Sequence, residues 1–204
     1  MLSAIAKSAP VAGIAAFDFT RRMQAICSDM TMRLDELRHI DVERVAVCFC
    51  QARKRVDHGM FASLTPLRFA DGALTTRRRG REYTLQRLMH TSGHEMLYVL
   101  SFYLPRFMDQ TFREKLITIV HELWHISPHF NGDIRRHAGR CYAHTGSQKN
   151  FDAHADGLAQ RWLALDPPEE LWSFLKGSFD DLIRENGRIV GVKIQRPKLI
   201  PVRS

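Results

Sequence analysis

The sequence predicts an α+β fold in which a small mixed sheet packs on a central helix and on the helices that flank it. Apolar residues recur at spacings of three and four in three segments, which is typical of amphipathic helices. These segments are 17–38, 111–126 and 147–165. Three other segments are rich in β-branched and aromatic residues, which is typical of strands. They are 45–50, 64–69 and 96–104.

Each of the first two helices is expected to bury one apolar face. In the first, this face consists of Phe19, Met23, Ile26, Cys27, Met30 and Leu34. The second begins with Thr111 and Glu114, which fit a capping box because each side chain can satisfy a backbone N–H of the other residue. Its apolar stripe, which would pack on the sheet, consists of Phe112, Leu116, Ile119, Val120 and Leu123. This helix should end near Ile126, because Pro128 disfavours helical geometry at the preceding residue.

The remaining elements are predicted from boundary residues. Ser147 is the expected N-cap of the third helix, and Pro167 and Pro168 separate that helix from a last one at about 169–185. Residues 188–194 favour one more strand. The strand at 96–104 has two interpretations, an edge strand to which an extended peptide adds or a central buried strand.

The chain should form one domain over residues 17–194, because no repeat or linker interrupts it. We expect a disordered extension over 1–16, whose apolar run is too interrupted for a good secretory signal, and a basic tail over 195–204. No stretch reaches the roughly 18–20 apolar residues that a membrane-spanning helix needs. The four cysteines form no CxxC pair, which favours free thiols in a reducing compartment. A soluble, cytoplasmic protein is therefore predicted.

The formal charge of +8 is not uniformly distributed: the chain has one dense cluster of arginines, and its tail from Arg188 is basic without an acidic residue. The cluster consists of Arg77, Arg78, Arg79 and Arg81. A solvated loop is one interpretation, since runs of like charge commonly serve only to keep a chain in solution. Contact with nucleic acid is the other, because phosphate backbones attract such clusters.

The motif His121-Glu122-Leu123-Trp124-His125 is a HExxH sequence on the second helix. Histidines four residues apart project from one face of a helix and can bind a single Zn²⁺ ion. Glu122 then lies beside the metal, where it can act as the general base for zinc-bound water. The near match His94-Glu95 lacks the second histidine and is interpreted as a loop or edge feature.

A catalytic zinc site needs a third protein ligand, and the sequence leaves several candidates. No glutamate occurs between Glu122 and Glu169, and the extended HExxHxxGxxH pattern fails at Pro128 and Asn131. The candidates that remain are His129, His137, His144, His154, Asp133, Asp152 and Asp156. His144 is favoured because it precedes the third helix after a returning loop, and His154 and Asp152 are the main alternatives.

Two further residues near the motif are candidates for supporting roles. Tyr142 could donate to a tetrahedral oxyanion, as could His137 or Arg140, although Tyr142 could equally be a packing residue. Asp133 could orient a metal-bound histidine, or it could serve the turn at 131–132.

The stretch VHELWHISPHFNGDIRRHAGRCYAHTGSQKNFD, residues 120–152, resembles the phage-type metallopeptidase families and, more distantly, the SprT-like zincins. The resemblance implies a zincin-like fold, zinc at His121, His125 and His144, and Glu122 as the catalytic carboxylate. The chain departs from SprT-like proteins at Thr145, which separates the third histidine from Gly146, and it lacks their cysteine zinc ribbon.

Together these features predict a zinc-dependent metallopeptidase whose substrate is a protein or peptide. Two alternatives stand beside this prediction. One is a nucleic-acid-binding module with a structural or vestigial zinc site, and the other is a metal hydrolase that acts on a non-peptide bond.

Overall fold

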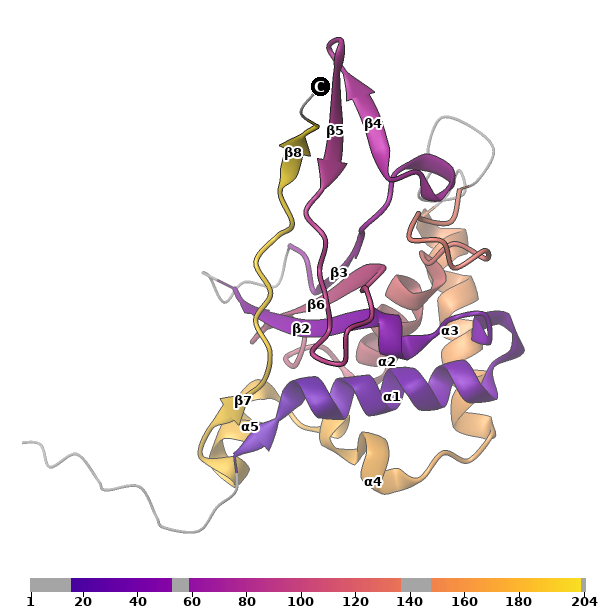
Figure 1. Cartoon of the computed structure of the whole chain (residues 1–204). Coiled ribbons are helices and arrows are strands. Elements are labelled where there is room, and N and C mark those ends of the chain that lie inside the picture. Colours follow the sequence, from indigo (N-terminus) through magenta and orange to yellow (C-terminus); the bar gives the residue numbers. More distant parts are fainter. Residues whose placement is uncertain (1–15, 53–58, 137–147, 203–204) are drawn as a thin grey trace, which may run out of the picture.

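The computed structural model describes residues 16–52, 59–136 and 148–202, and these residues form an α+β fold (Figure 1). The helices are α1 (Phe19–Arg33), α2 (Phe112–Trp124), α3 (Gln148–Ala164), α4 (Glu169–Trp172) and α5 (Phe179–Asn186). Short 3-10 turns lie at Asp35–Leu37, Val42–Arg44, Ala70–Gly72 and Ser173–Lys176. The predicted disordered extension lies outside the described residues except at its last position.

The described strands form three small sheets where the sequence predicted one. The central sheet has the order β2-β6-β3, with β2 (Val45–Gln51), β6 (Tyr98–Leu104) and β3 (Ala62–Pro66). A second sheet has the order β4-β5-β8, with β4 (Thr75–Arg78), β5 (Arg81–Leu85) and β8 (Leu199–Pro201). The third is a parallel pair of β1 (Phe17–Asp18) and β7 (Ile189–Val190).

Strand β6 is the centre of the β2-β6-β3 sheet, so the edge-strand interpretation of residues 96–104 is wrong. It pairs in parallel with β2 and antiparallel with β3, which leaves β3 as an edge. The side chains of β6 are buried except for the partly exposed Tyr103, as expected for a strand with neighbours on both sides. Any extended ligand that adds to this sheet near α2 must therefore pair with β3.

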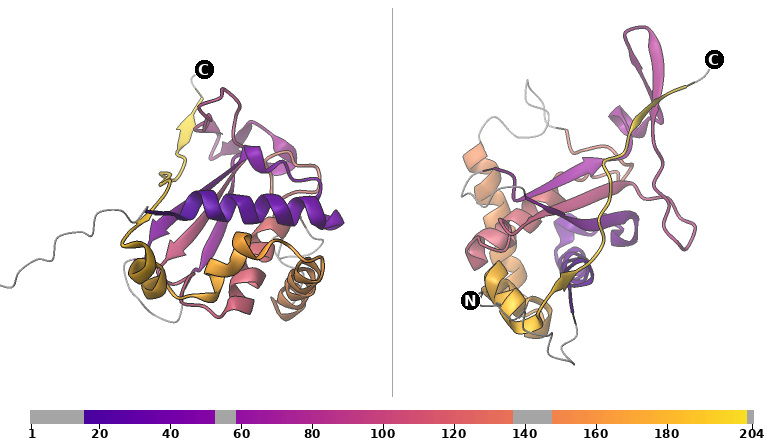
Figure 2. Two further views of the ribbon diagram at one scale, coloured as in Figure 1. Left: turned by 90° about the horizontal axis from the view of Figure 1, so that it is seen from below. Right: turned by 90° about the vertical axis from the view of Figure 1, so that its left-hand side faces the viewer.

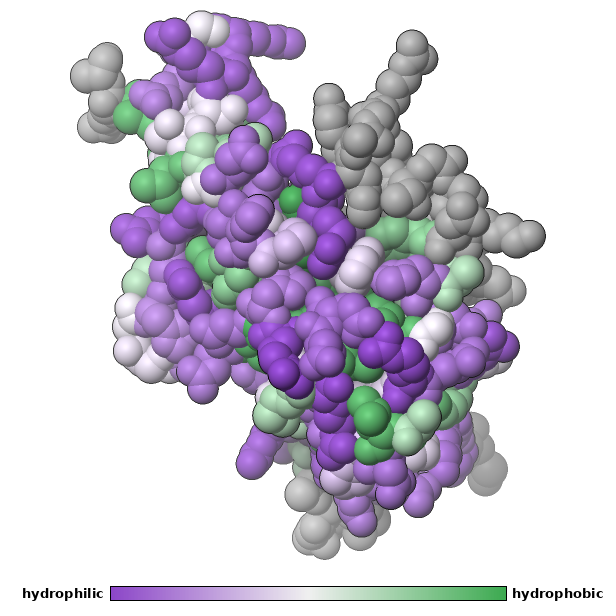
Figure 3. Space-filling model, turned by 90° about the vertical axis from the view of Figure 1, so that its right-hand side faces the viewer, coloured by the Kyte–Doolittle hydropathy of each residue, from purple (hydrophilic) through white to green (hydrophobic). Residues whose placement is uncertain are grey.

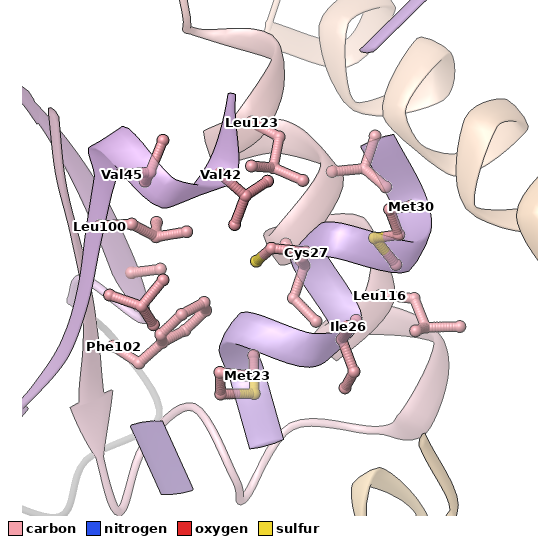
Figure 4. Packing of buried hydrophobic residues seen from close by; sticks show 14 of the residues in the cluster. Met23, Ile26, Cys27, Met30, Val42, Val45, Leu100, Phe102, Leu116 and Leu123 are labelled. Carbon is pink, nitrogen blue, oxygen red and sulfur yellow. The ribbon is translucent and has the colours of Figure 1, made fainter. Parts of the chain in front are cut away.

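Helices α1 and α2 cover one face of the central sheet, and α3 packs on α2 (Figure 1). The six residues predicted for the buried face of the first helix are all fully buried. Figure 4 shows Met23 and Cys27 of α1 on the side of Leu100 and Phe102 of the sheet, whereas Ile26 lies on the side of Leu116 of α2. The opposite face is covered by a smaller cluster that includes Leu67 and Met96, against which Ile194 of the C-terminal segment packs.

The last predicted helix, at 169–185, is broken in the structure. Gly177 and Ser178 interrupt it, and a second capping box between Ser178 and Asp181 starts α5. Lys115 of α2 is buried at the break, where its Nζ donates to the carbonyls of Leu175 and Gly177 at 2.9 and 2.6 Å. Burial lowers the pKa of Lys115 to about 8. A lysine from a distant helix thus satisfies carbonyl groups that the break releases.

The arginine cluster belongs to a β-hairpin, so the prediction of a loop is wrong there. Residues 75–85 form β4, a two-residue turn and β5, and we call this segment the arginine hairpin. The C-terminal segment adds to it as β8, so residues 199–201 of the predicted basic tail are a strand. Thr75, Thr76, Tyr83 and Thr84 are good strand formers, and they account for strand structure despite the arginines between them.

Two features of the structure bear on the predicted compartment: its helices and its cysteines. No helix within the described ranges combines the length and the apolar character needed to cross a membrane. Cys27, Cys48 and Cys50 are free thiols, and Cys141 lies outside the described residues.

The near match at His94-Glu95 is a structural feature of the segment that leads into β6. The Glu95 carboxylate accepts hydrogen bonds from Arg87 at 2.8 Å and from Arg68 at 2.6 Å. These two guanidinium groups lower the pKa of Glu95 to about 2. Only 10% of the Glu95 side chain is exposed, whereas Arg87 is largely in solvent. The pairing therefore joins the segments that follow β3 and β5 to the segment that leads into β6.

We expect Glu95→Gln to lower the free energy of unfolding by about 1–2 kcal/mol at pH 7, a figure that allows for solvent screening of Arg87. Because the folded state depresses this pKa, the contribution is complete above the unfolded value of about 4.3. It is lost as the pH falls towards 2, so the difference between wild type and variant should shrink over that range. Urea unfolding at pH 7 and pH 3 measures this, and an equal difference at both values would contradict it.

Candidate metal centre

Helix α2 holds its polar residues in a defined orientation because both its start and its buried face are fixed. The predicted capping box is present, with Thr111 N–H donating to Glu114 at 2.8 Å and the Thr111 hydroxyl accepting from Glu114 N–H. Most of the predicted stripe is fully buried, and Phe112 packs on Trp172 instead. His121 and His125 therefore lie at the margin of the buried face, where α3 meets α2.

His121 and His125 direct their Nε2 atoms towards the same point. The two Nε2 atoms are 3.1 Å apart, and the rings meet edge to face with centroids separated by 4.8 Å. Two imidazole nitrogens bound at about 2.0–2.1 Å to a tetrahedral zinc ion lie about 3.3 Å apart. The histidine pair therefore fits two positions of a zinc site.

Helix α3 supplies two residues that hold the histidine rings. Asp152 Oδ1 lies 3.3 Å from Nδ1 of His121. The ring of Phe151, which is buried, contacts both imidazoles, with centroids 4.5 Å from His121 and 5.0 Å from His125. A carboxylate at Nδ1 favours the tautomer that carries its proton there and leaves Nε2 free to bind a metal. Asp152 thus occupies the outer side of the ring, away from the point where the Nε2 atoms converge.

Glu122 lies between α2 and the edge strand β3. Only 8% of the residue is exposed. Burial raises the pKa of Glu122 to about 7, and a backbone hydrogen bond from Leu64 of β3 opposes part of the rise. A carboxylate in such a site changes its protonation state near neutral pH, which is the range that proton transfer in hydrolysis requires.

A cleft of about 480 Å³ opens beside these residues. It is lined by His121, Glu122, Asp152 and, from the same helix, Ile117 and Thr118, together with residues 59–62 at the start of β3. The wall therefore combines apolar groups with the polar residues of the motif, a combination that is typical of ligand sites.

The favoured third ligand, His144, lies outside the described residues, as do Tyr142, His137 and Arg140. Among the residues that the structure does describe, no three histidine, cysteine, aspartate or glutamate side chains form a group that could hold a metal ion. The described residues thus include two of the three predicted ligands, His121 and His125, and metal binding by these residues and by His144 stays a prediction.

The other candidates for the third ligand have different surroundings. His154 packs on Trp124, with ring centroids 4.3 Å apart, and Asp156 forms a bidentate ion pair with Arg113 at 2.6 and 2.7 Å. His129 is exposed in the turn that follows α2. Each of these contacts matches an ordinary structural role.

Asp133 is a turn residue that joins its own turn to the segment at Asp71. Its carboxylate accepts from the backbone N–H groups of Asp71 at 2.9 Å and Ile134 at 2.8 Å, and from the guanidinium of Arg136. Burial alone would raise the pKa of Asp133, but these three donors more than offset it and the pKa is lowered. No described histidine is among these partners, so they favour the turn interpretation over the orientation of a ligand.

Sequence reasoning missed two contributions to the site. One is the backbone of Leu64, because which strand forms the edge beside α2 depends on long-range pairing. The other is the packing of Phe151 against both histidines. Its place directly before Asp152, near the start of α3, was the only available signal.

The arginine hairpin belongs to a different part of the molecule from α2 (Figures 1 and 2).

No family model, curated protein or solved structure matches the chain in comparisons with known proteins. The resemblance to phage-type metallopeptidases therefore depends on the motif and its spacing alone.

Asp152 contacts Nδ1 of His121, so its removal should weaken zinc binding less than the removal of a metal ligand would. We expect Asp152→Ala to retain bound zinc with an affinity about 10–100-fold weaker, as is typical when the partner of a metal-bound histidine is removed. His144→Ala should lose zinc, because a stable catalytic site needs three protein ligands. Zinc content after dialysis against a mild chelator measures both effects.

His154→Ala is the matched control, since it removes an imidazole from α3 that packs on Trp124. It should retain zinc like the wild type. Loss of zinc in Asp152→Ala or His154→Ala, together with full retention in His144→Ala, would move the third ligand to α3.

Proposed function

We propose that the chain is a zinc-dependent metallopeptidase with a zincin-like arrangement of its active site. The observation that carries the proposal is the convergence of the His121 and His125 Nε2 atoms at 3.1 Å, with the buried Glu122 carboxylate between the same helix and an edge strand. Two imidazoles and a carboxylate with this spacing form the part of a HExxH site that lies on its helix.

His121 and His125 would hold the zinc ion together with His144, the proposed third ligand. When bound, zinc would lower the pKa of a coordinated water molecule and polarise the carbonyl of the scissile bond. Asp152 acts on the ligand and not on the substrate, because its carboxylate faces Nδ1 of His121. Phe151 restricts rotation of both rings, which keeps the two Nε2 atoms directed at one point.

Glu122 is the proposed general base. Its carboxylate accepts the proton of the attacking water and passes it to the amine that leaves when the peptide bond breaks. The proton is thus moved by one side chain in two steps. Burial between α2 and β3 keeps this carboxylate away from bulk water, and the Leu64 backbone holds it in position.

Strand β3 is the proposed binding surface for an extended peptide. Tyr103 N–H donates to Phe61 O at 2.9 Å, so Phe61, and by alternation Ser63 and Thr65, direct their backbone groups towards β6. The backbone groups of Ala62 and Leu64 then face the free edge, where Leu64 already contacts Glu122. A substrate that pairs with this edge by strand addition would cross the 480 Å³ cleft beside His121.

The alternative of a structural zinc site fits these residues less well. Structural sites are usually rich in cysteine and closed to water. Among the described cysteines, Cys27 is buried on α1 and Cys48 lies 3.2 Å from Ser101 in the sheet, so neither faces the histidine pair. A metal hydrolase that acts on a non-peptide bond would use the same groups, and only a substrate assay separates it from a peptidase.

We expect Glu122→Gln to bind zinc like the wild type but to lose about 10²–10⁴-fold in the rate of peptide hydrolysis, because an amide cannot accept the proton. The assay is cleavage of an unfolded protein such as casein by the zinc-loaded full chain. Glu170→Gln is the control, since Glu170 is exposed on α4 and distant from the motif in sequence.

Wild-type turnover in the Glu122→Gln variant would refute the assigned mechanism. Zinc-loaded wild-type protein that cleaves no peptide bond but hydrolyses an ester or amide of another class would refute the peptidase assignment while keeping the metal centre.

A further inference from the structure

The arginine hairpin projects from the rest of the molecule together with β8 (Figures 1 and 2). The upper left of Figure 3, which corresponds to this projection, is mostly hydrophilic and has smaller neutral and apolar areas at its base. All four arginines of the cluster are exposed, and within the described part of the chain none of them forms an ion pair. Lys198 is exposed at the end of the hairpin away from the tip, where its carbonyl accepts from Gln86 N–H, and Glu82 is the only acidic residue in 75–85 and 196–202.

The turn of the hairpin carries a charge that its backbone geometry does not require. Arg78 pairs with Arg81, which leaves Arg79 and Gly80 as a two-residue loop with φ values of 47° and 78°. Both values are positive, as in type I′ turns, where asparagine and glycine are the favoured residues. An arginine at the first position is a costly choice for the turn itself. The conformation of the turn therefore does not account for an arginine at position 79.

The register adds a second unfavourable feature. Arg78 and Arg81 are direct cross-strand neighbours and so share a face of the hairpin. Like charges in this arrangement destabilise a sheet, and no acidic side chain within the described residues compensates them. A partner that supplies negative charge to this face would remove the repulsion, whereas on the opposite face Arg77 already lies across from Glu82.

We propose that the arginine hairpin is a docking surface for double-stranded DNA, with its tip in the major groove and its arginines on the phosphates. The major groove is about 12 Å wide and admits a two-stranded β-ribbon. Figure 2 shows the hairpin projecting beyond the central sheet, so its tip is accessible to a groove among the described parts of the chain. The four guanidinium groups then neutralise phosphates on the groove walls.

Other polyanionic partners fit the hairpin less well. Single-stranded nucleic acid is typically bound on exposed aromatic platforms, whereas Tyr83 is partly buried and residues 77–81 contain no aromatic side chain. The deep, narrow major groove of duplex RNA does not admit such a ribbon. A membrane surface would favour an apolar group at the tip, and residues 77–81 have none.

The test is fluorescence anisotropy of a short labelled DNA duplex titrated with the full chain at several salt concentrations. If four phosphates are neutralised, the affinity of the wild type should fall about 100-fold between 50 and 200 mM salt. The hairpin variant carries Arg77→Gln, Arg78→Gln, Arg79→Asn and Arg81→Gln. Asparagine suits the positive φ at position 79, so this variant removes charge without opposing the turn. It should bind much more weakly and with a flatter dependence on salt.

A charge-matched control separates the hairpin from the net charge of the protein. It carries Arg21→Gln, Arg38→Gln, Arg184→Gln and Arg188→Gln, four exposed positions on or near the ends of α1 and α5 and the 3-10 turn after α1. This variant should retain the affinity and the salt dependence of the wild type. Glu122→Gln should also bind DNA normally, since this proposal does not depend on the proposed peptidase activity.

Three results would overturn the proposal. One is no binding of duplex DNA by the wild type at 50 mM salt, and another is equal loss of affinity in the hairpin variant and its control. The third is tighter, hairpin-dependent binding to a single-stranded oligonucleotide of the same length or to phosphatidylserine vesicles, which would assign the surface to that partner.

Discussion

The apolar stripe of α2 sets the rotation of that helix about its axis, and the geometry of the candidate metal centre depends on this rotation. Leu116, Ile119, Val120 and Leu123 are each at most 1% exposed. Burial of each such side chain contributes about 1.5–3 kcal/mol, so a helix rotated to expose them would be strongly disfavoured. With the stripe fixed, residues 121, 122 and 125 can face only α3 and β3.

The site is completed by segments that pack on α2 from both sides. Helix α3 brings Phe151 and Asp152 to the imidazole rings, while β3 brings a backbone donor to Glu122. The segment after α2 returns to the helix as well, because Arg135 N–H donates to His125 O at 2.7 Å. These contacts restrict the orientations of His121, Glu122 and His125, and the proposed metal binding depends on those orientations.

The local parts of this arrangement were predictable from the sequence, and the non-local parts were not. The buried faces of α1 and α2 and the capping box at Thr111 follow from spacings within a single helix, and the structure confirms them. The edge position of β3 depends on the pairing of Ala62 with Phe102, forty residues away. The break before α5 has a local signal in Gly177 and in the Ser178–Asp181 capping box, which sequence reasoning missed, but its stabilisation by Lys115 from another helix has none.

The arginine hairpin shows a different limit of sequence reasoning. Its charges were evident, but they concealed the strand formers between them, and the third strand comes from the C-terminal segment through the pairing of Tyr83 with Pro201. Charge density alone did not distinguish a solvated loop from a projecting ribbon, which is the distinction that bears on a nucleic-acid partner.

The two candidate functional regions use charge in opposite environments. Glu122 lies in a desolvated site where interactions are strong and little affected by salt, whereas the arginines act in water and are screened within about 10 Å at moderate ionic strength. The two regions are nonetheless joined by a short path, because the Asp133 carboxylate accepts from Asp71 N–H just before β4 and lies eight residues beyond His125. A duplex held at the hairpin would therefore be held by a segment fixed to the turn that follows the helix of the candidate metal centre.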